Sequence, residues 1–411
     1  MDQHKLYRTL RLLGEKKFRT EEQLVGYVLE NIIQIEEIPI RGGRIWKLEP
    51  TRGTYRLMKQ CGQIDRIKTN FRIRIPDYPP FLLLSRKGGT VIGTEINKYL
   101  RKKGIRRYSA TGVGEKVRWK GYDLYPYVIA ISGEHLNHEL TYTLNIIGSA
   151  LTWSLQDRKI ESKAKQLEQD LDKAREIQKS ILPQHEEKFH DYDLYGISLP
   201  DRVVGGDFFD YLHASDDKER LGVVVGDAAS KGLSAAAQAL YVSGALRMGI
   251  EYQTKISALI GRINLLVNKT FHTEHFISLV YAELTTSENG LVFYVNAGHS
   301  NPILLRGRTD EVDLLRATGQ VIGPFPNEKY RTEFTLMQKG DILLLYTDGI
   351  TEAANESRQM YGEQRLIQKL KQHKSKTPRE ICRFILEDVQ IHNRLMEYSD
   401  DKTLVVIKRT R

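Results

Sequence analysis

The chain has 411 residues, of which 40% are hydrophobic and 28% are charged. This composition is typical of a folded globular protein and excludes an intrinsically disordered chain, and the length suits two or three domains. A membrane-spanning helix is not expected, because the most apolar stretch, around Leu144 to Leu155, falls short of the roughly 18 uncharged apolar residues required and is interrupted by polar side chains.

The N-terminal sequence and the cysteines point to a cytoplasmic protein. The first residues, MDQHKLYRTL, lack the long apolar core of a signal peptide. Cys61 and Cys382 are far apart in the sequence and have no metal-type spacing, so we expect no disulfide framework.

The net charge of +10 is concentrated in the N-terminal part of the chain. Residues 1–155 contain 27 Lys and Arg against 15 Asp and Glu, which leaves a small negative balance for the remainder. The basic residues are densest at Arg101, Lys102, Lys103, Arg106, Arg107, Lys116, Arg118 and Lys120. A nucleic-acid or anionic-membrane contact is one interpretation. A solvated basic face is the favoured one, because no recognisable nucleic-acid motif accompanies these residues.

Residues 1–155 are predicted to form a mixed α and β domain. Apolar residues at helical spacing predict a helix over Glu21 to Ile33, alternating runs such as GRIWKLEP, FRIRIP and YPYVIAISGE predict strands, and a last apolar helix is expected over His135 to Leu155. The order of helix, strands and helix resembles a GAF-like sensor domain. This resemblance is one of topology, and it identifies no ligand-binding residue.

A charged helix over residues 156–184 is predicted to connect the two domains. Its apolar positions recur at alternating spacings of four and three residues, which is the seam of a two-stranded coiled coil: Ile160, Ala164, Leu167, Leu171, Ala174, Gln178 and Ile181. Gln178 would weaken packing at that seam and could fix its register, and Pro183 ends the helix. The favoured interpretation is a parallel dimer connector, and the alternative is a helix packed on its own domain.

Residues 185–411 are predicted to form a layered α+β domain. Strand-like runs include DLYGISL, RLGVVVGD, ISLVYAEL, GLVFYVNAGH, NPILLR, DILLLYTD and TLVVIKR. Helices are expected over 232–252, 255–270 and 362–396. Many antiparallel strands with a few long helices favour this class of fold.

Four aspartates in this region stand where a strand-like run begins or ends. Asp227 and Asp348 end such runs, whereas Asp207 and Asp400 precede them. If the runs pair as antiparallel strands, all four carboxylates meet at one edge. Two carboxylates about 4 Å apart repel by roughly 4 kcal/mol at an effective dielectric near 20, so such a cluster requires protons or cations. Carboxylates without Cys or a His cluster favour hard ions such as Mg²⁺ or Mn²⁺.

Six ordered segments in this region carry a family resemblance: VVGGDFFDY, GDAASKGLSAAAQAL, NAGHSNPILL, LLLYTDGITEAAN, MYGEQRL and SDDKTLVVI. They resemble the SpoIIE/RsbU-like branch of the metal-dependent PPM serine/threonine phosphatases, which are related to phosphatase 2C. REIQKSILP at 175–183 resembles the helix that usually precedes that domain. The resemblance covers residues 170–411 approximately and implies α/β/β/α layers.

The resemblance implies a site with two Mn²⁺ or Mg²⁺ ions. Asp227 would bridge both ions with the backbone carbonyl of Ala228 as a further ligand, and Asp227 and Asp348 are the predicted catalytic residues. Asp348 and Asp400 would hold one ion and Asp207 the other. Such a pair of ions lowers the pKa of a bridging water and orients it towards a phosphate ester. Gly205, Gly206, Gly226 and Gly349 stand where the backbone approaches the metals or turns tightly.

Several neighbouring residues leave alternatives open. Asp401 competes with Asp400 as a ligand, and Asp210 is either a support for the ligands or a solvent-exposed strand residue. His299 is a general acid or, as favoured, part of a structural turn. Arg202 either contacts the substrate phosphate or is a surface residue, which is the favoured interpretation.

One position departs from the family pattern. Where the family commonly has GDVSGKG, this chain has GDAASKG, so that Ser230 replaces a glycine. A serine with positive φ would cost about 1 kcal/mol, and activity is expected to survive.

Three functions are therefore compared. The first is a cytoplasmic phosphatase that dephosphorylates a partner regulator, by resemblance an anti-sigma-factor antagonist, under control of the N-terminal domain. The second is a phosphoprotein-binding scaffold without catalysis, which the intact metal positions argue against. The third is a nucleic-acid-binding regulator that uses the basic N-terminal part.

Overall fold

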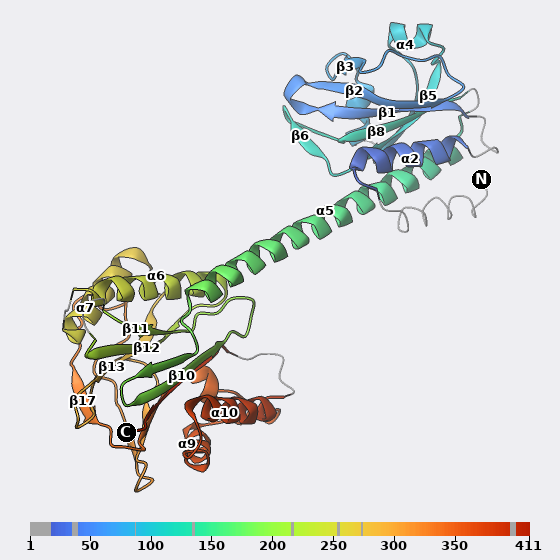
Figure 1. Ribbon diagram of the computed structural model, residues 1–411. Coiled ribbons are helices and arrows are strands. Elements are labelled where there is room, and N and C mark those ends of the chain that lie inside the picture. Colours follow the sequence, from blue (N-terminus) through green and yellow to red (C-terminus); the bar gives the residue numbers. More distant parts are fainter. Residues whose placement is uncertain are drawn as a thin grey trace. The chain divides into compact units, whose positions relative to one another are not determined.

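The computed structural model describes residues 18–34, 40–86, 88–133, 136–214, 218–252, 255–272, 274–394 and 400–411. The chain divides into two compact units, residues 1–166 and 167–411 (Figure 1). One uninterrupted helix, α5 (His138–Ile181), contributes to both. The last helix predicted for the N-terminal domain and the predicted connector are therefore one element. His135, where the first of them was expected to begin, lies outside the described residues, as does the segment 1–17.

The first unit is built on one six-stranded antiparallel sheet. Its strands are β1 (Ile40–Glu49), β2 (Thr54–Gly62), β3 (Arg72–Arg74), β4 (Thr90–Thr94), β5 (Arg107–Val113) and β8 (Tyr127–Gly133), in the order β3-β2-β1-β8-β5-β4. β6 (Val117–Trp119) and β7 (Tyr122–Leu124) form a separate hairpin. The helices are α2 (Glu21–Ile33), α3 (Pro80–Arg86) and α4 (Lys98–Lys102). The runs GRIWKLEP, FRIRIP and YPYVIAISGE form strands as predicted.

Helices cover both faces of this sheet. Because neighbouring strand residues point to opposite faces, Ile45 packs in the core formed with α2 and the first half of α5, whereas Trp46 packs in the core formed with α3 and α4. Thr20 accepts a hydrogen bond from the backbone of Gln23 and so begins α2 at the predicted residue.

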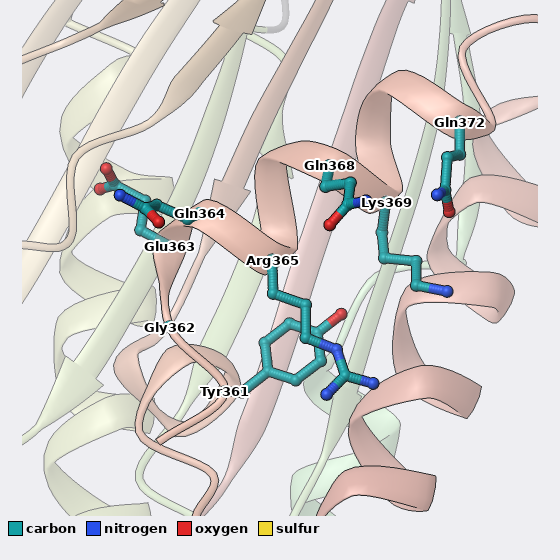
Figure 2. Close-up of a pocket in the computed structure, with 8 residues that line it drawn as sticks. All are labelled: Tyr361, Gly362, Glu363, Gln364, Arg365, Gln368, Lys369 and Gln372. Atoms are coloured by element: carbon teal, nitrogen blue, oxygen red, sulfur yellow. The ribbon is translucent and has the colours of Figure 1, made fainter. Parts of the chain in front are cut away.

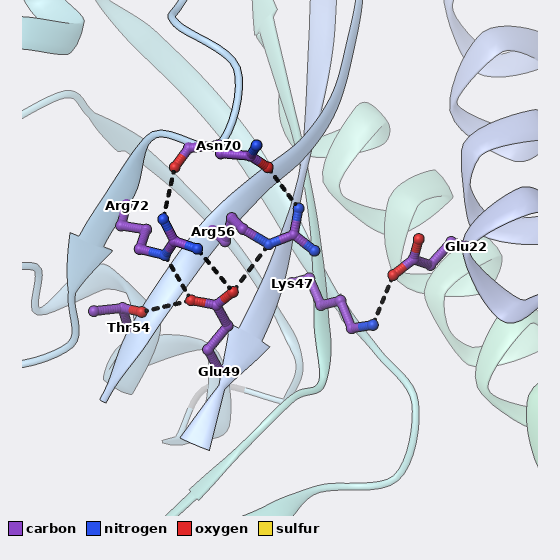
Figure 3. Close-up of polar contacts among 7 residues, drawn as sticks. All are labelled: Glu22, Lys47, Glu49, Thr54, Arg56, Asn70 and Arg72. Carbon is purple, nitrogen blue, oxygen red and sulfur yellow. Dashed lines mark hydrogen bonds and ion pairs between the residues drawn. The ribbon is translucent and has the colours of Figure 1, made fainter. Parts of the chain in front are cut away.

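Part of the basic excess of the first unit is neutralised within it. Glu49 accepts hydrogen bonds from Arg72, Arg56 and Thr54, and Figure 3 shows these side chains around its carboxylate. The hydrogen bonds from Arg72, followed by the other partners, lower the pKa of Glu49 to about 2. The densest basic residues lie elsewhere. Arg101, Lys102, Arg106, Arg107, Lys116, Arg118 and Lys120 are all exposed, as a solvated basic face requires.

The second unit contains two antiparallel sheets. One comprises β9 (Glu186–Phe189), β10 (Tyr192–Leu199), β15 (Ile303–Leu305), β16 (Val312–Leu314), β18 (Ile342–Tyr346) and β19 (Lys402–Arg409), in the order β16-β15-β18-β19-β10-β9. The other comprises β11 (Phe208–Leu212), β12 (Arg220–Ala228), β13 (Ile277–Thr285), β14 (Leu291–Ala297) and β17 (Glu333–Leu336) in sequence order. The helices are α6 (Leu233–Ile250), α7 (Ile256–Thr270), α8 (Asp348–Thr351), α9 (Glu363–Gln372) and α10 (Pro378–His392).

The two sheets pack face to face between two layers of helices. Val223 and Val225 of β12 share a core with Leu343 and Leu345 of β18, whereas Val224 between them faces α6 and α7. On the other sheet, alternate residues of β18 and β19 pack against α9 and α10. The mixed α+β fold predicted for this region is therefore confirmed.

The predicted helix over 362–396 is two helices. α9 ends at Gln372, and Thr377 begins α10 with a capping box completed by Glu380, with Pro378 in the first turn. Met396, where that helix was predicted to end, lies outside the described residues. Among the described residues, no helix has the length and apolarity needed to span a membrane, and Cys61 and Cys382 are both free thiols.

Candidate metal centre

The first pair of predicted ligands meets at the junction of β11 and β12. These strands are antiparallel, and Phe208 at the start of β11 pairs with Gly226 near the end of β12. Asp207, just before Phe208, and Asp227, just after Gly226, therefore lie side by side.

The second pair meets in the same way in the other sheet. Tyr346 at the end of β18 pairs with Leu404 near the start of β19, and the backbone N–H of Thr347 donates to the carbonyl of Thr403 at 3.1 Å. Asp348 and Asp400 follow and precede these strands. The four aspartates thus come from two sheets and not from one edge, which refines the sequence-based expectation.

The two pairs lie close together, because the hydroxyl of Thr347, next to Asp348, donates to the Asp207 carboxylate. Burial raises the pKa of Asp227 to about 7, assisted by the charges of Asp348, Asp400 and Asp401. Burial, followed by the charge of Asp227, raises the pKa of Asp207 well above its ordinary value. The pKa of Asp348 also rises, because it is buried and lies near Glu352 and Asp400. The structure brings all four predicted aspartates into one acidic cluster.

A threonine that the sequence did not single out orients Asp207. The hydroxyl of Thr347 donates to Oδ2 of Asp207 at 2.6 Å and accepts from the backbone N–H of Thr403 at 3.0 Å. This threonine follows β18, so it links the end of one sheet to the carboxylate at the start of the other. The only feature of the sequence that could have identified Thr347 is its place at the end of a strand-like run, next to an Asp-Gly pair.

Asp400 and Asp401 have different surroundings. The Asp401 carboxylate accepts from the backbone N–H groups of Asp201 at 2.8 Å and Gly206 at 2.6 Å, with a longer contact to that of Asp207 at 3.4 Å. Asp400 is exposed and lies 3.4 Å from the ammonium of Lys231. Asp401 therefore anchors the loop before β11, which leaves Asp400 as the better candidate ligand.

Close approach explains the glycines around the cluster. A Cβ on Gly205 would lie 2.5 Å from a carboxylate oxygen of Asp401, and one on Gly349 would collide with the Asp401 carbonyl. A Cβ on Gly206 would lie 3.0 Å from the carbonyl oxygen of Ala228, the predicted backbone ligand. None of these glycines has a positive φ, so space and not turn geometry requires them.

Ser230 carries no backbone strain. It is not among the residues with positive φ, whereas Gly232 has φ of 69°. Its backbone N–H donates to the carbonyl of Ala228 at 2.6 Å, and its hydroxyl accepts from Gln238 at 2.8 Å. The strain considered for a serine at this position is absent.

The donor set fits hard divalent cations. Among the described residues, no three His, Cys, Asp or Glu side chains form a preformed metal cage. Burial, followed by the charges of neighbouring carboxylates, nevertheless raises the pKa values of Asp207, Asp227 and Asp348. Mg²⁺ and Mn²⁺ prefer oxygen ligands, and binding of such an ion would neutralise the repulsion between these carboxylates.

Comparisons with known proteins agree with this geometry. A family model described as Stage II sporulation protein E (SpoIIE) matches residues 217–410. Phosphoserine phosphatase RsbU of Bacillus subtilis is 24% identical over 295 residues, which are 70% of this chain and 83% of that protein. The C-terminal part of this chain is thus similar to SpoIIE/RsbU-like phosphatases of the PP2C type, and the second unit is called the phosphatase domain after this similarity.

Two further similarities extend the comparison. Protein IcfG of Synechocystis sp. is 27% identical over 267 residues, 58% of this chain but only 41% of that protein. The chain thus spans less than half the length of this relative. The solved SiaA-PP2C domain of Pseudomonas aeruginosa superimposes with a TM-score of 0.53 at 21% identity, covering 60% of this chain and 98% of that domain, which is a likeness of fold.

Metal binding should stabilise the phosphatase domain. At a free Mn²⁺ concentration one hundred times the dissociation constant, we expect the free energy of unfolding to rise by about 2.7 kcal/mol, because the ion binds only the folded cluster. Urea unfolding with and without Mn²⁺ measures the gain. Asp348→Asn should reduce it, and equal stability of the native chain with and without Mn²⁺ would contradict the metal assignment.

Asp210 is neither a ligand neighbour nor exposed. Its carboxylate is buried and accepts from Arg247 of α6 at 2.6 and 3.0 Å, and from Ser243 at 3.3 Å. The solvent-exposed interpretation of Asp210 is wrong, because this ion pair joins β11 to α6. Arg202 is exposed, in agreement with its interpretation as a surface residue.

His299 lies inside the phosphatase domain beside β13. Its Nδ1 is 2.7 Å from the hydroxyl of Ser278, and its backbone N–H donates to Oδ1 of Asn296 at 2.8 Å. Burial lowers the pKa of His299 to about 4. A neutral, buried imidazole favours the structural role over that of a general acid.

The contribution of His299 to the stability of the phosphatase domain should therefore fall in mild acid. The folded pKa of His299 lies below its unfolded value of about 6.5, so the unfolded chain takes up the proton first and stability is lost as pH falls from 6.5 towards 4. Between pH 7 and pH 5 we expect this group to remove about 2 kcal/mol. Urea unfolding of the native chain and His299→Gln at both pH values measures the difference, and equal pH dependence of the two would contradict it.

One hollow in the phosphatase domain has none of the four aspartates among its lining residues. It has a volume of about 670 Å³ and follows α9, where Figure 2 shows Arg365 and Lys369 pointing to the same side. Both cations contact Asp388, at 2.8 and 3.1 Å, and Tyr361 donates to the same carboxylate. Because both cations already pair with Asp388, this hollow is a poor candidate for a phosphate site.

Proposed function

We propose that this protein is a metal-dependent protein phosphatase that hydrolyses phosphoserine or phosphothreonine on a partner protein. The observation that carries the proposal is the convergence of Asp207, Asp227, Asp348 and Asp400 from the ends of two strand pairs. The phosphatase domain and the name of the relative RsbU, a phosphoserine phosphatase, support it.

In this proposal two Mn²⁺ or Mg²⁺ ions bind at the cluster. Asp227 would serve both ions with the carbonyl of Ala228 as a further ligand, Asp348 and Asp400 would hold one ion, and Asp207 the other. The ions would supply an activated water for attack on the phosphate ester. The protein residues hold the ligands in place, with Thr347 fixing Asp207 and Asp401 fixing the loop before it.

The proposed substrate is a phosphorylated partner regulator of the anti-sigma-factor-antagonist class. This follows from the resemblance to the SpoIIE/RsbU-like phosphatases. The test is Mn²⁺-dependent release of phosphate from a phosphoserine peptide by the full chain and by a chain that begins at Leu167. Hydrolysis by both supports the proposal. Mn²⁺ binding without hydrolysis by either would replace it with the scaffold function.

The first unit is proposed to be a GAF-like sensor of a small ligand. A hollow of about 330 Å³ lies between the β4–β5 strands and α5, lined by Gly89, Gly112, Tyr125, Asn145 and Thr152 among others. Such a space suits a small molecule. Different rates for the full and shortened chains would show that this unit controls the phosphatase domain.

A homodimer through α5 is proposed because this helix carries one exposed row of large apolar side chains. Ile146, Trp153, Ile160 and Leu167 follow one another at intervals of seven residues, and all four side chains are exposed. Seven-residue spacing of large apolar side chains is the pattern of a coiled-coil seam, so a second copy of the chain is the expected occupant. Sedimentation of the native chain against Ile160→Glu tests it, since a monomer in both cases contradicts the dimer.

A further inference from the structure

The end of α5 holds the loop that leads into the acidic cluster. Gln178 is buried, with 7% of its surface exposed, although it lies on a helix whose preceding turns are mostly exposed. Its Nε2 donates to the carbonyl of Gly205 at 2.8 Å, and its Oε1 accepts from the N–H of Gly205 at 3.2 Å. One turn earlier, Nε of Arg175 donates to the carbonyl of Val203 at 3.1 Å.

These contacts correct the prediction that Gln178 lies on a dimer seam. Within the second unit its side chain is directed into its own chain, so the alternative interpretation, a helix packed on its own domain, applies to this end of α5. A primary amide both donates and accepts, and here it satisfies both backbone groups of one residue. This two-point contact fixes the position and the orientation of the Gly205 peptide.

The same loop is held from its other side by the last strand of the domain. Asp401 accepts from the N–H groups of Gly206 and Asp207, and a Cβ on Gly206 would already lie 2.9 Å from Cβ of Ala235. The loop therefore has little room to move while both contacts are made. Asp207 follows Gly206 directly in the chain. A shift of Gly205 therefore also moves the Asp207 carboxylate, which Thr347 orients.

We propose that Gln178 is a positioning residue that couples the place of the α5 helix end to the metal affinity of the acidic cluster. The inference rests on the proposed function and concerns the regulation of that same site. When Gln178 holds Gly205, the Asp207 carboxylate faces Asp227. When the helix end moves, the loop loses both amide contacts and the Asp207 ligand is no longer held in place.

The chain allows this role to be separated from simple packing of the helix. The end of α5 has an independent anchor, because Nη2 of Arg247 donates to the carbonyl of Ile181 at 2.6 Å. Gln178→Met has nearly the same size as the native side chain and removes only the two hydrogen bonds. Gln169 is exposed on the same helix, so Gln169→Met is the matched control.

The experiment measures the full chain and both variants without metal and in a Mn²⁺ titration. Calorimetry should give a Mn²⁺ dissociation constant raised about tenfold by Gln178→Met, the loss typical of residues that orient ligands, and unchanged by Gln169→Met. Hydrogen exchange of the metal-free protein should be faster in residues 203–207 of Gln178→Met only. Phosphopeptide hydrolysis by Gln178→Met should return to within about twofold of the native rate at saturating Mn²⁺.

Each outcome decides one question. Native Mn²⁺ affinity and native exchange in Gln178→Met overturn the inference, as does a native chain that binds no Mn²⁺. A native chain that binds Mn²⁺ but releases no phosphate overturns the proposed function alone, because the binding and exchange measurements still judge Gln178. If Gln178→Met does not fold, Gln178→Glu replaces it. Glutamate keeps the acceptor for the Gly205 N–H, but its carboxylate repels the Gly205 carbonyl oxygen. It should therefore also raise the Mn²⁺ dissociation constant and speed hydrogen exchange in residues 203–207.

Discussion

Asp227→Asn should abolish Mn²⁺-dependent phosphoester hydrolysis. Asp227 lies beside Asp207, and its pKa also responds to the charges of Asp348, Asp400 and Asp401 in the other pair, so it is the carboxylate best placed to serve both ions. Loss of a shared ligand removes several kcal/mol of transition-state stabilisation, which corresponds to a fall in rate of about 10³-fold or more. Phosphate release from a phosphoserine peptide measures it.

The same variant should be more stable than the native chain when no metal is present. The neutral amide removes a charge that is buried among other carboxylates, so urea unfolding in a chelator should show a higher free energy of unfolding. The control is Asp313→Asn, which changes an exposed aspartate paired with Arg306. An undiminished rate of phosphate release in Asp227→Asn would contradict the metal assignment. Equal losses of rate in Asp227→Asn and Asp313→Asn would indicate that the substitutions damage the fold in general.

Arg247→Met should destabilise the phosphatase domain by about 3 kcal/mol, because it leaves the Asp210 carboxylate buried without its cation. Asp210 is 2% exposed, and its remaining partners are the Ser243 hydroxyl and a backbone N–H. Urea unfolding at neutral pH measures the loss. Arg262→Met, on the exposed face of α7, is the matched control.

A second substitution checks the reason for that loss. Asp210→Asn in the Arg247→Met background removes the buried charge, so part of the lost stability should return. The contact of Arg247 with the Ile181 carbonyl stays broken and keeps the recovery incomplete. A loss below about 0.5 kcal/mol in Arg247→Met, the size of an ordinary surface change, contradicts the role of Arg247 as the required partner of the buried Asp210 carboxylate.

The strand ends of the acidic cluster could be predicted because they depend on local pattern. A run such as LGVVVGD predicts where a strand ends and that Asp227 lies at that end. Antiparallel pairing of this strand with the one that follows Asp207 then places the two aspartates side by side. The helix α2 agrees with its predicted range, because its apolar residues recur at helical spacing from Leu24 onward. The division of the four aspartates between two sheets depends on tertiary packing, which the pattern of single strands does not contain.

The roles of the residues that orient the ligands were missed for the same reason. Thr347 contacts Asp207 across 140 positions of sequence and Asp401 contacts Gly206 across 195, so neither contact has a local signal. Gln178 was assigned to a seam because heptad spacing identifies a helix face that needs a partner. Heptad spacing does not show whether that partner is a second chain or a loop of the same chain. In the structure, the partner of Gln178 is the loop that contains Gly205.

The place of β19 has a consequence for how the phosphatase domain folds. β19 follows every other strand in sequence, yet it lies in the interior of its sheet between β18 and β10. Until it inserts, two strands present unpaired edges, and the carboxylates that flank it are absent from the cluster. Contacts of such sequence separation form slowly. The proposed metal site would therefore be complete only after β19 has inserted, so ion binding would report the completed fold.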